Sequence, residues 1–201
     1  MFPPLLRDAV VFASLLSMLS TGLTLTYMTT KVPNFAHGDF ATISMYTSLI
    51  LAEIFGLSPY LGIPLGFLVG SLTALLLYIS VLKPLLDRGA NYIILMIATI
   101  AYDMILISVI NILADSLTYA YKIATRLFIL KSYDFSIFGL PGIAVVAPLI
   151  AVVMVVVLYF FLNRTKFGIA MRAAIENPSL AGVVGINVNL TYAVSWFISG
   201  G

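Results

Sequence analysis

The chain has 201 residues, of which 62% are hydrophobic and only 9% are charged, and its net charge at pH 7 is +2. Soluble domains carry about 25% charged residues, so the composition excludes an ordinary water-soluble domain, and the small net charge gives no reason to expect nucleic-acid binding. The absence of cysteine and the single histidine exclude disulfides and thiolate sites and argue against a transition-metal centre. We therefore expect one membrane domain over residues 1–201, with no cofactor and no metal.

Long apolar runs alternate with polar links along the chain. Nearly uncharged runs of about 18 or more residues are typical of transmembrane helices. The predicted spans cover about residues 9–30, 40–57, 60–82, 92–113 and 141–162. A sixth run begins near Val188 and has 14 residues, too few to cross a bilayer of about 30 Å. The sequence thus predicts an all-α polytopic bundle of about five full spans and the start of a sixth, incomplete at its C-terminus.

Hydroxyl side chains recur along one face of the first span. They are spaced three, four and three residues apart: Ser14, Ser17, Thr21 and Thr24. This spacing places them on one side of a helix. Two interpretations are open, because such hydroxyls either line a hydrated path, with Thr21 and Thr24 as candidates, or bond to their own helix or a neighbouring one.

The first link, residues 31–39, predicts a break in the helical backbone. Pro33 cannot donate a backbone hydrogen bond, and broken backbone at membrane depth is tolerated only where it is buried in protein or lines a water-filled cavity. Polar side chains lie beside the break: Asn34, His37 and Asp39. They either line the translocation route or form an interfacial turn in which Asp39 is the N-cap of a helix that begins at Phe40.

Small residues recur every four positions in the third span, at Gly62, Gly66 and Gly70. Glycines at this spacing let helix backbones approach closely. We expect a packing ridge, either within this chain or against a second membrane subunit.

Asp103 lies near the middle of the fourth span. A charge there costs about 2.5–3.5 kcal/mol to insert, so it should face the bundle interior or a cavity. It is either an ion or proton relay or a structural residue held by Tyr102 or Ser108.

A connection expected over residues 114–139 separates the fourth and fifth spans and could hold a short amphipathic segment on the membrane surface.

The link over residues 163–187 is polar and predicts two short helices. Thr165 is a candidate N-cap for the first helix, and Asn177 caps the second, with Pro178 at its first position. Gly185 is a typical C-terminal glycine. The loop is either a docking surface for a protein in water or an amphipathic link that binds lipid headgroups.

Basic residues give the orientation. If each span crosses once, residues 31–39, 83–91 and 163–187 share one face and carry six basic residues, against four on the other face. This asymmetry predicts that 163–187 lies in the cytoplasm. The side of the N-terminus reverses if 31–39 is re-entrant.

Two segments resemble the branched-chain amino acid permease family, the membrane subunits of an ABC importer. RTKFGIAMRAAIENPSLAGVVGINV resembles the family's cytoplasmic signature loop, and GLTLTYMTTKVPNFAHGDF resembles its first span and Asn-Phe-Ala-His-Gly element. The two matches lie about 125 residues apart, in the family's order, and the resemblance covers nearly the whole chain. Family members continue through further spans after this loop.

The resemblance implies a transport subunit of the cell membrane with no catalytic site of its own, driven by cytoplasmic ATP-binding subunits. The residues that would face the ATPase are Arg172, Ala173, Ala174, Glu176, Asn177 and Pro178. Further implied partners are a second permease subunit, related or identical, an extracytoplasmic substrate-binding protein and membrane lipid. The implied substrates are branched-chain or related amino acids. The segment TIAYDMILIS around Asp103 departs from the family pattern.

The alternative function is a secondary transporter or channel that uses Asp103 for ion coupling. A polytopic membrane enzyme is less favoured, because the sequence shows no cluster of histidines, cysteines or paired carboxylates.

Overall fold

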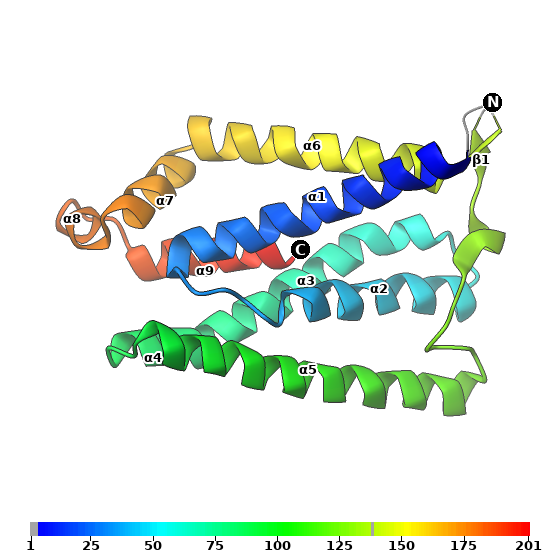
Figure 1. The fold of residues 1–201 in the computed structure, drawn as a ribbon, viewed down its shortest axis with the longest axis horizontal. Coiled ribbons are helices and arrows are strands. Elements are labelled where there is room, and N and C mark those ends of the chain that lie inside the picture. Colours follow the sequence, from blue (N-terminus) through cyan, green and yellow to red (C-terminus); the bar gives the residue numbers. More distant parts are fainter. Residues whose placement is uncertain (1–3, 138) are drawn as a thin grey trace.

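The computed structural model describes residues 4–137 and 139–201 and consists of helices that lie roughly side by side (Figure 1). The helices are α1 (Pro4–Thr30), α2 (His37–Glu53), α3 (Gly62–Leu77), α4 (Lys83–Asp87), α5 (Tyr92–Tyr121), α6 (Ile143–Arg164), α7 (Lys166–Glu176), α8 (Pro178–Val183) and α9 (Val188–Gly200). Shorter elements are η1 (Pro59–Leu61), the π-helical η2 (Tyr78–Leu82), η3 (Leu130–Tyr133) and an antiparallel pair of strands, β1 (Ser136–Ile137) and β2 (Leu140–Pro141).

Four helical stretches of the described residues are long and apolar enough to cross a membrane. They are Pro4–Thr30, Pro59–Asp87, Tyr92–Tyr121 and Ile143–Arg164. The predicted all-α polytopic class is confirmed. The run predicted as the second span forms α2, whose 17 residues reach only about 26 Å, and the run that begins near Val188 forms the 13 residues of α9.

The break between α1 and α2 runs back into the bundle. α1 ends at the left of Figure 1, the chain returns towards the middle, and α2 begins there and runs to the opposite end. Lys31 has a left-handed φ of 58° and ends α1, while the Thr99 hydroxyl of α5 donates to the Pro33 carbonyl at 3.3 Å. Val32 and Ala36 are fully buried. Buried and exposed residues thus alternate along the broken segment, with Pro33, Phe35 and Gly38 exposed.

α2 begins at His37, three residues before the predicted start. The N-cap position belongs to Ala36, which makes no side-chain cap, and Asp39 lies inside the first turn. The prediction that Asp39 is an N-cap is therefore wrong.

The glycine ridge of α3 packs within the chain. A Cβ built at Gly62 would meet Ser48, one at Gly66 would meet Ser44, and one at Gly70 would meet Gly200. The first two neighbours belong to α2 and the third to α9. The missing side chains therefore let α2 and α9 approach the α3 backbone.

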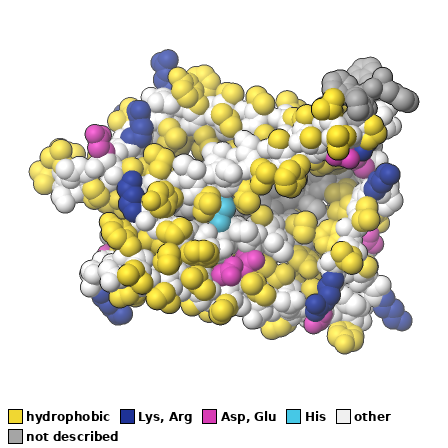
Figure 2. Space-filling model, viewed as in Figure 1, with side chains coloured by type: hydrophobic (Ala, Val, Ile, Leu, Met, Phe, Trp, Pro, Cys, Tyr) yellow, Lys and Arg dark blue, Asp and Glu magenta, His cyan; other side chains and the backbone are white. Residues whose placement is uncertain are grey.

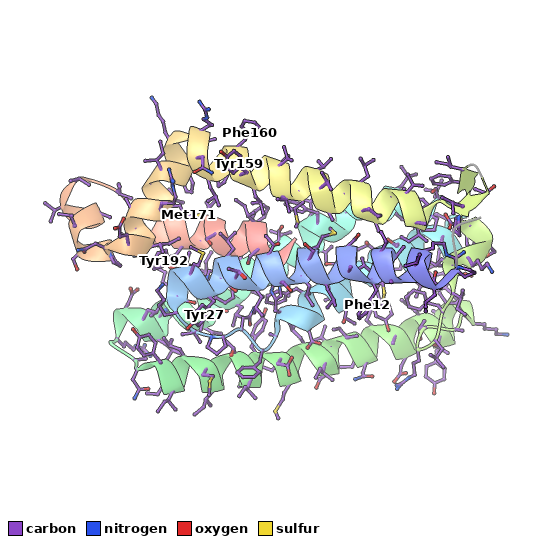
Figure 3. The ribbon with its side chains drawn as sticks, turned by 45° about the horizontal axis from the view of Figure 1, so that its top comes forward. Phe12, Tyr27, Tyr159, Phe160, Met171 and Tyr192 are labelled. Carbon is purple, nitrogen blue, oxygen red and sulfur yellow. The ribbon has the colours of Figure 1, made fainter. Side chains whose placement is uncertain are left out.

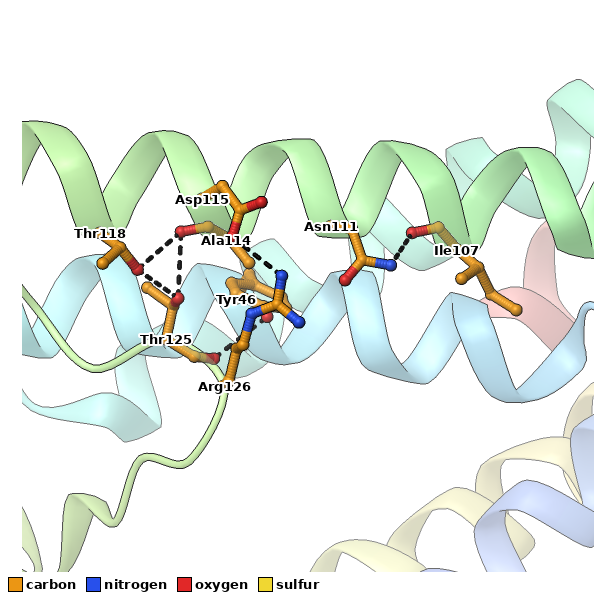
Figure 4. Close-up of polar contacts among 8 residues, drawn as sticks. All are labelled: Tyr46, Ile107, Asn111, Ala114, Asp115, Thr118, Thr125 and Arg126. Atoms are coloured by element: carbon orange, nitrogen blue, oxygen red, sulfur yellow. Dashed lines mark hydrogen bonds and ion pairs between the residues drawn. The ribbon is translucent and has the colours of Figure 1, made fainter.

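The connection after α5 is tied down by hydrogen bonds (Figure 4). α5 continues to Tyr121, so the predicted start of this connection at residue 114 is wrong. The Thr125 hydroxyl donates to the Ala114 carbonyl at 3.0 Å, and the Tyr46 hydroxyl donates to the Thr125 carbonyl at 3.1 Å. An exposed ion pair, Arg126 with Asp115 at 3.0 Å, raises the pKa of the Arg126 guanidinium. These bonds hold the connection against the ends of α2 and α5.

Candidate functional site

The polar loop after α6 forms the two predicted helices, α7 and α8. The Thr165 hydroxyl accepts from the Gly168 amide at 2.9 Å, and the Asn177 side chain accepts from the Leu180 amide at 3.0 Å. Both predicted N-caps are confirmed. Gly185 has a φ of 86°, which its lack of a Cβ permits, and ends the loop as predicted. In Figure 1, α8 is the outermost element at its end of the bundle.

One face of α7 packs on the bundle and the other is open. Met171 and Ala174 are fully buried. Arg172 is exposed, and its guanidinium donates to the Asn163 side chain at 3.1 Å. Glu176 and Pro178 are exposed as well. Most of the predicted docking residues thus lie on the open side: Arg172, Glu176, Asn177 and Pro178 are exposed and Ala173 is half-buried. Ala174 points inward, so its assignment to the docking face is not supported.

The tip of the loop carries apolar side chains that the sequence interpretation did not single out. Leu180 is 61% exposed, Val183 83% and Val184 68%. Their signal in the sequence was a short apolar run, SLAGVV, inside an otherwise polar link. An exposed apolar group at the far end of a capped helix is suited to contact with another protein.

The loop shares its end of the bundle with the end of α1 and with α4 (Figure 1). The basic residues of this end are Lys31, Lys83, Arg88, Arg164, Lys166 and Arg172, and those of the opposite end are Arg7, Lys122, Arg126 and Lys131. The links 83–91 and 163–187 and the start of the link 31–39 therefore lie at one end of the bundle, while the rest of 31–39 returns into its middle.

A cavity of about 310 Å³ lies between α1 and the broken segment. It is lined by Leu19, Ser20, Leu23, Pro33, Asn34, Phe35, His37 and Gly38. The His37 ring Nε2 lies 3.1 Å from the Leu19 carbonyl oxygen, which ties α2 to α1. The Asn34 side chain is 5% exposed and has no hydrogen-bond partner among the described residues. Two of the predicted path residues therefore border one cavity.

A second cavity, of about 350 Å³, lies between α1 and α6 and borders on the first at Ser20. Thr21 and Thr24 line it. Their hydroxyls donate to the carbonyls of Ser17 and Ser20 at 2.7 Å. Each hydroxyl is thus bonded to its own helix, as one of the two interpretations expected, and it also borders the cavity.

The carboxyl group of Asp103 on α5 lies next to that of Asp39 on α2. Figure 2 shows acidic side chains gathered beside the histidine on this face. The two expected hydrogen-bond partners of Asp103 bond elsewhere. The Tyr102 hydroxyl donates to the Thr73 carbonyl at 3.2 Å, and the Ser108 hydroxyl donates to the Met104 carbonyl at 2.9 Å. Within the described part of the chain, no three acidic or histidine side chains are grouped to bind a metal.

These features define a polytopic membrane protein with small cavities beside a broken helix and a structured polar loop at one end. Residues 5–201 match the family described as "Branched-chain amino acid transport system / permease component", and the chain belongs to this family. Together with its four long apolar helices, this makes it a multi-pass protein of the cell membrane.

The curated relatives differ in what their names state. A probable branched-chain amino acid transport permease from Methanocaldococcus jannaschii is 44% identical over 98% of this chain and 62% of its own length. A nucleoside ABC transporter permease from Lactococcus lactis is 26% identical over 77% of this chain and 50% of its own. A high-affinity branched-chain amino acid permease from Pseudomonas aeruginosa is 25% identical over 96% of this chain and 65% of its own length. The chain thus spans between half and two thirds of these relatives, and no solved structure matches it.

Proposed function

We propose that this chain forms a permease subunit of an ABC importer for branched-chain or related amino acids. The observation that carries the proposal is the α7–α8 loop, because a membrane bundle has no structural need for two capped helices beyond its end. Family membership adds the class of partner. In this proposal, cytoplasmic ATP-binding subunits bind the loop, a second permease subunit completes the path, and an extracytoplasmic binding protein delivers substrate.

The α7–α8 loop is joined directly to the membrane helix α6. α7 follows α6 with only Thr165 between them, and the Arg172–Asn163 hydrogen bond holds the two helices together. Movement of a docked ATPase would therefore tilt α6 and its neighbours. A two-state transition of this kind needs differential contacts in the two states, which the exposed tip at Leu180 and Val183 can supply.

The two cavities beside α1 support a path along this helix. They lie between α1 and two different neighbours, and they are lined by apolar side chains with a few polar groups. A solute that passes by repacking of α1 would meet Asn34, His37, Thr21 and Thr24. Such a lining is compatible with an aliphatic amino acid, and two of the three relatives are named for branched-chain amino acid transport.

A second candidate is a secondary transporter or channel in which Asp103 couples ion flow. The observation that favours it is the neighbouring Asp39 carboxyl, because ionisable groups at membrane depth are functional candidates. Ion-gradient-driven uptake by the chain without an ATPase would support it and would contradict an ABC importer.

The docking proposal is tested by charge reversal at Arg172. Reversing a charge inside a docked interface costs about 2–5 kcal/mol, so Arg172→Glu should lower co-purification of the ATPase at least about tenfold. The matched control is Arg88→Glu, since Arg88 is exposed at the same end of the bundle but outside the loop. Unchanged co-purification of Arg172→Glu, in a membrane-inserted protein, would contradict docking through α7.

A further inference from the structure

The carbonyl of Ala174 lacks a donor from its own helix. α7 ends at Glu176 because Asn177 is extended, with φ −147° and ψ 94°. The residue four positions after Ala174 is Pro178, which has no N–H to donate. Ala174 is also fully buried, so bulk water does not reach it. A buried carbonyl in this position needs a partner from elsewhere in the chain.

Tyr192 of α9 supplies that partner. Its hydroxyl donates to the Ala174 carbonyl at 3.2 Å. Figure 3 shows Tyr192 and Met171 at the junction of α7 and α9. Met171 adds an apolar contact surface that is fully buried. Apolar contact is non-directional, whereas a hydrogen bond fixes direction, so the hydroxyl adds a directional link between α7 and α9.

The ring of Tyr192 belongs to a different environment from its hydroxyl. It packs against the main hydrophobic cluster, which contains Tyr78 and Trp196. Trp196 is fully buried and stacks on Tyr78 with 6.2 Å between ring centroids. The Tyr78 hydroxyl in turn donates to the Asn189 carbonyl at 3.5 Å. One side chain therefore joins the polar loop to the centre of the bundle.

The cluster includes Tyr78 and Leu82 of η2, the one π-helical stretch among the described residues. π-helical segments are less stable than α-helix and occur often at functional sites. α9 also reaches α1, because the Ser195 hydroxyl donates to the Leu25 carbonyl at 3.4 Å, and it reaches α3 at Gly70. A shift of α9 would thus displace its contacts with α1, beside the cavities, and with η2.

We infer that Tyr192 is a positioning residue that transmits movement of the α7–α8 loop to α9 and through it to α1 and η2. This rests on the proposed function. The role is distinct from docking, since Tyr192 lies behind the loop and its hydroxyl points to the buried carbonyl of Ala174. Removal of the hydroxyl should leave ATPase binding intact and reduce the transport obtained from each ATP.

The test is Tyr192→Phe in the complete importer complex, reconstituted in vesicles with its ATPase and binding protein. The measurements are ATP hydrolysis, uptake of labelled leucine, ATPase co-purification and the unfolding temperature. We expect co-purification to be unchanged and uptake per ATP to fall by at least about fivefold. A second variant, Tyr192→Met, keeps an apolar side chain against the cluster and should uncouple in the same way. The matched control is Tyr159→Phe on α6, which loses a hydroxyl from an exposed ring (Figure 3).

The outcomes separate the two levels of the proposal. An unchanged ratio of uptake to ATP in Tyr192→Phe would overturn the transmission role alone, and so would a parallel fall of uptake, hydrolysis and unfolding temperature, which marks a purely structural role. Absence of ATP-driven uptake in the unmodified complex would overturn the proposed function, and this inference with it.

Discussion

The carboxyl groups of Asp103 and Asp39 are neighbours, so the role of either residue depends on the other. Each lies on a predominantly apolar helix, and α2 and α5 bring their carboxyl groups close together. Two adjacent carboxylates repel each other when both are ionised.

Asp103→Asn is therefore expected to preserve transport. The amide offers a donor to the neighbouring Asp39 carboxyl and removes the like-charge repulsion, so uptake should stay within about twofold, the effect of less than 1 kcal/mol. Leucine uptake by the assembled complex is the measurement. The control is Asp115→Asn, an exposed acid at the end of the same helix that pairs with Arg126. Loss of uptake by an assembled Asp103→Asn complex, with the control active, would favour a relay role for Asp103.

The sequence identified both acids as candidate functional residues but did not predict that they are neighbours. Asp39 and Asp103 are 64 residues apart, and their contact depends on how α2 packs beside α5. The cap assigned to Asp39 failed because α2 begins at His37, which places Asp39 inside its first turn. The N-caps at Thr165 and Asn177 were predictable, since each satisfies an amide three residues away.

At the scale of elements, the α3 glycines are the point where three helices meet most closely. A Cβ at Gly70 would meet the Gly200 backbone of α9, which cannot rotate away, and the Ser44 hydroxyl of α2. The four-residue spacing of the glycines predicted close helix packing. Which helices pack there could be seen only in the structure. α9 in particular lies more than 100 residues after these glycines in the sequence.

Gly70→Ala should destabilise the bundle by about 1–3 kcal/mol, the usual cost of adding a methyl group to a filled space. Thermal unfolding in detergent is the measurement. Gly38→Ala is the matched control, because a Cβ there meets nothing within 4 Å, and it should be neutral. Equal stability of the two variants would show that α9 does not approach α3 as closely as the structure has it.

At the scale of the whole molecule, composition and run length were enough to predict an all-α membrane bundle. The exact helix ends were not, because α5 extends into the predicted link until Lys122 adopts a left-handed φ of 57°. The bundle has two chemically different ends: one holds α4, α7 and α8, and the other holds the connection after α5 (Figure 1). The function proposed for the loop requires its end to lie in the cytoplasm, in line with its six basic residues against four.

Single cysteines test this orientation directly, because the chain has no cysteine of its own. Val183→Cys places a thiol on the tip of α8, where the side chain is 83% exposed, and Leu127→Cys places one in the opposite connection, where it is 91% exposed. With a membrane-impermeant maleimide on intact cells, we expect Leu127→Cys to react and Val183→Cys to react only after permeabilisation. Val152→Cys, on the outward face of α6 in the apolar region, should stay unlabelled in both conditions, because a thiolate does not form in hydrocarbon. Labelling of Val183→Cys in intact cells would place the α7–α8 loop outside the cytoplasm, where no ATPase could bind it.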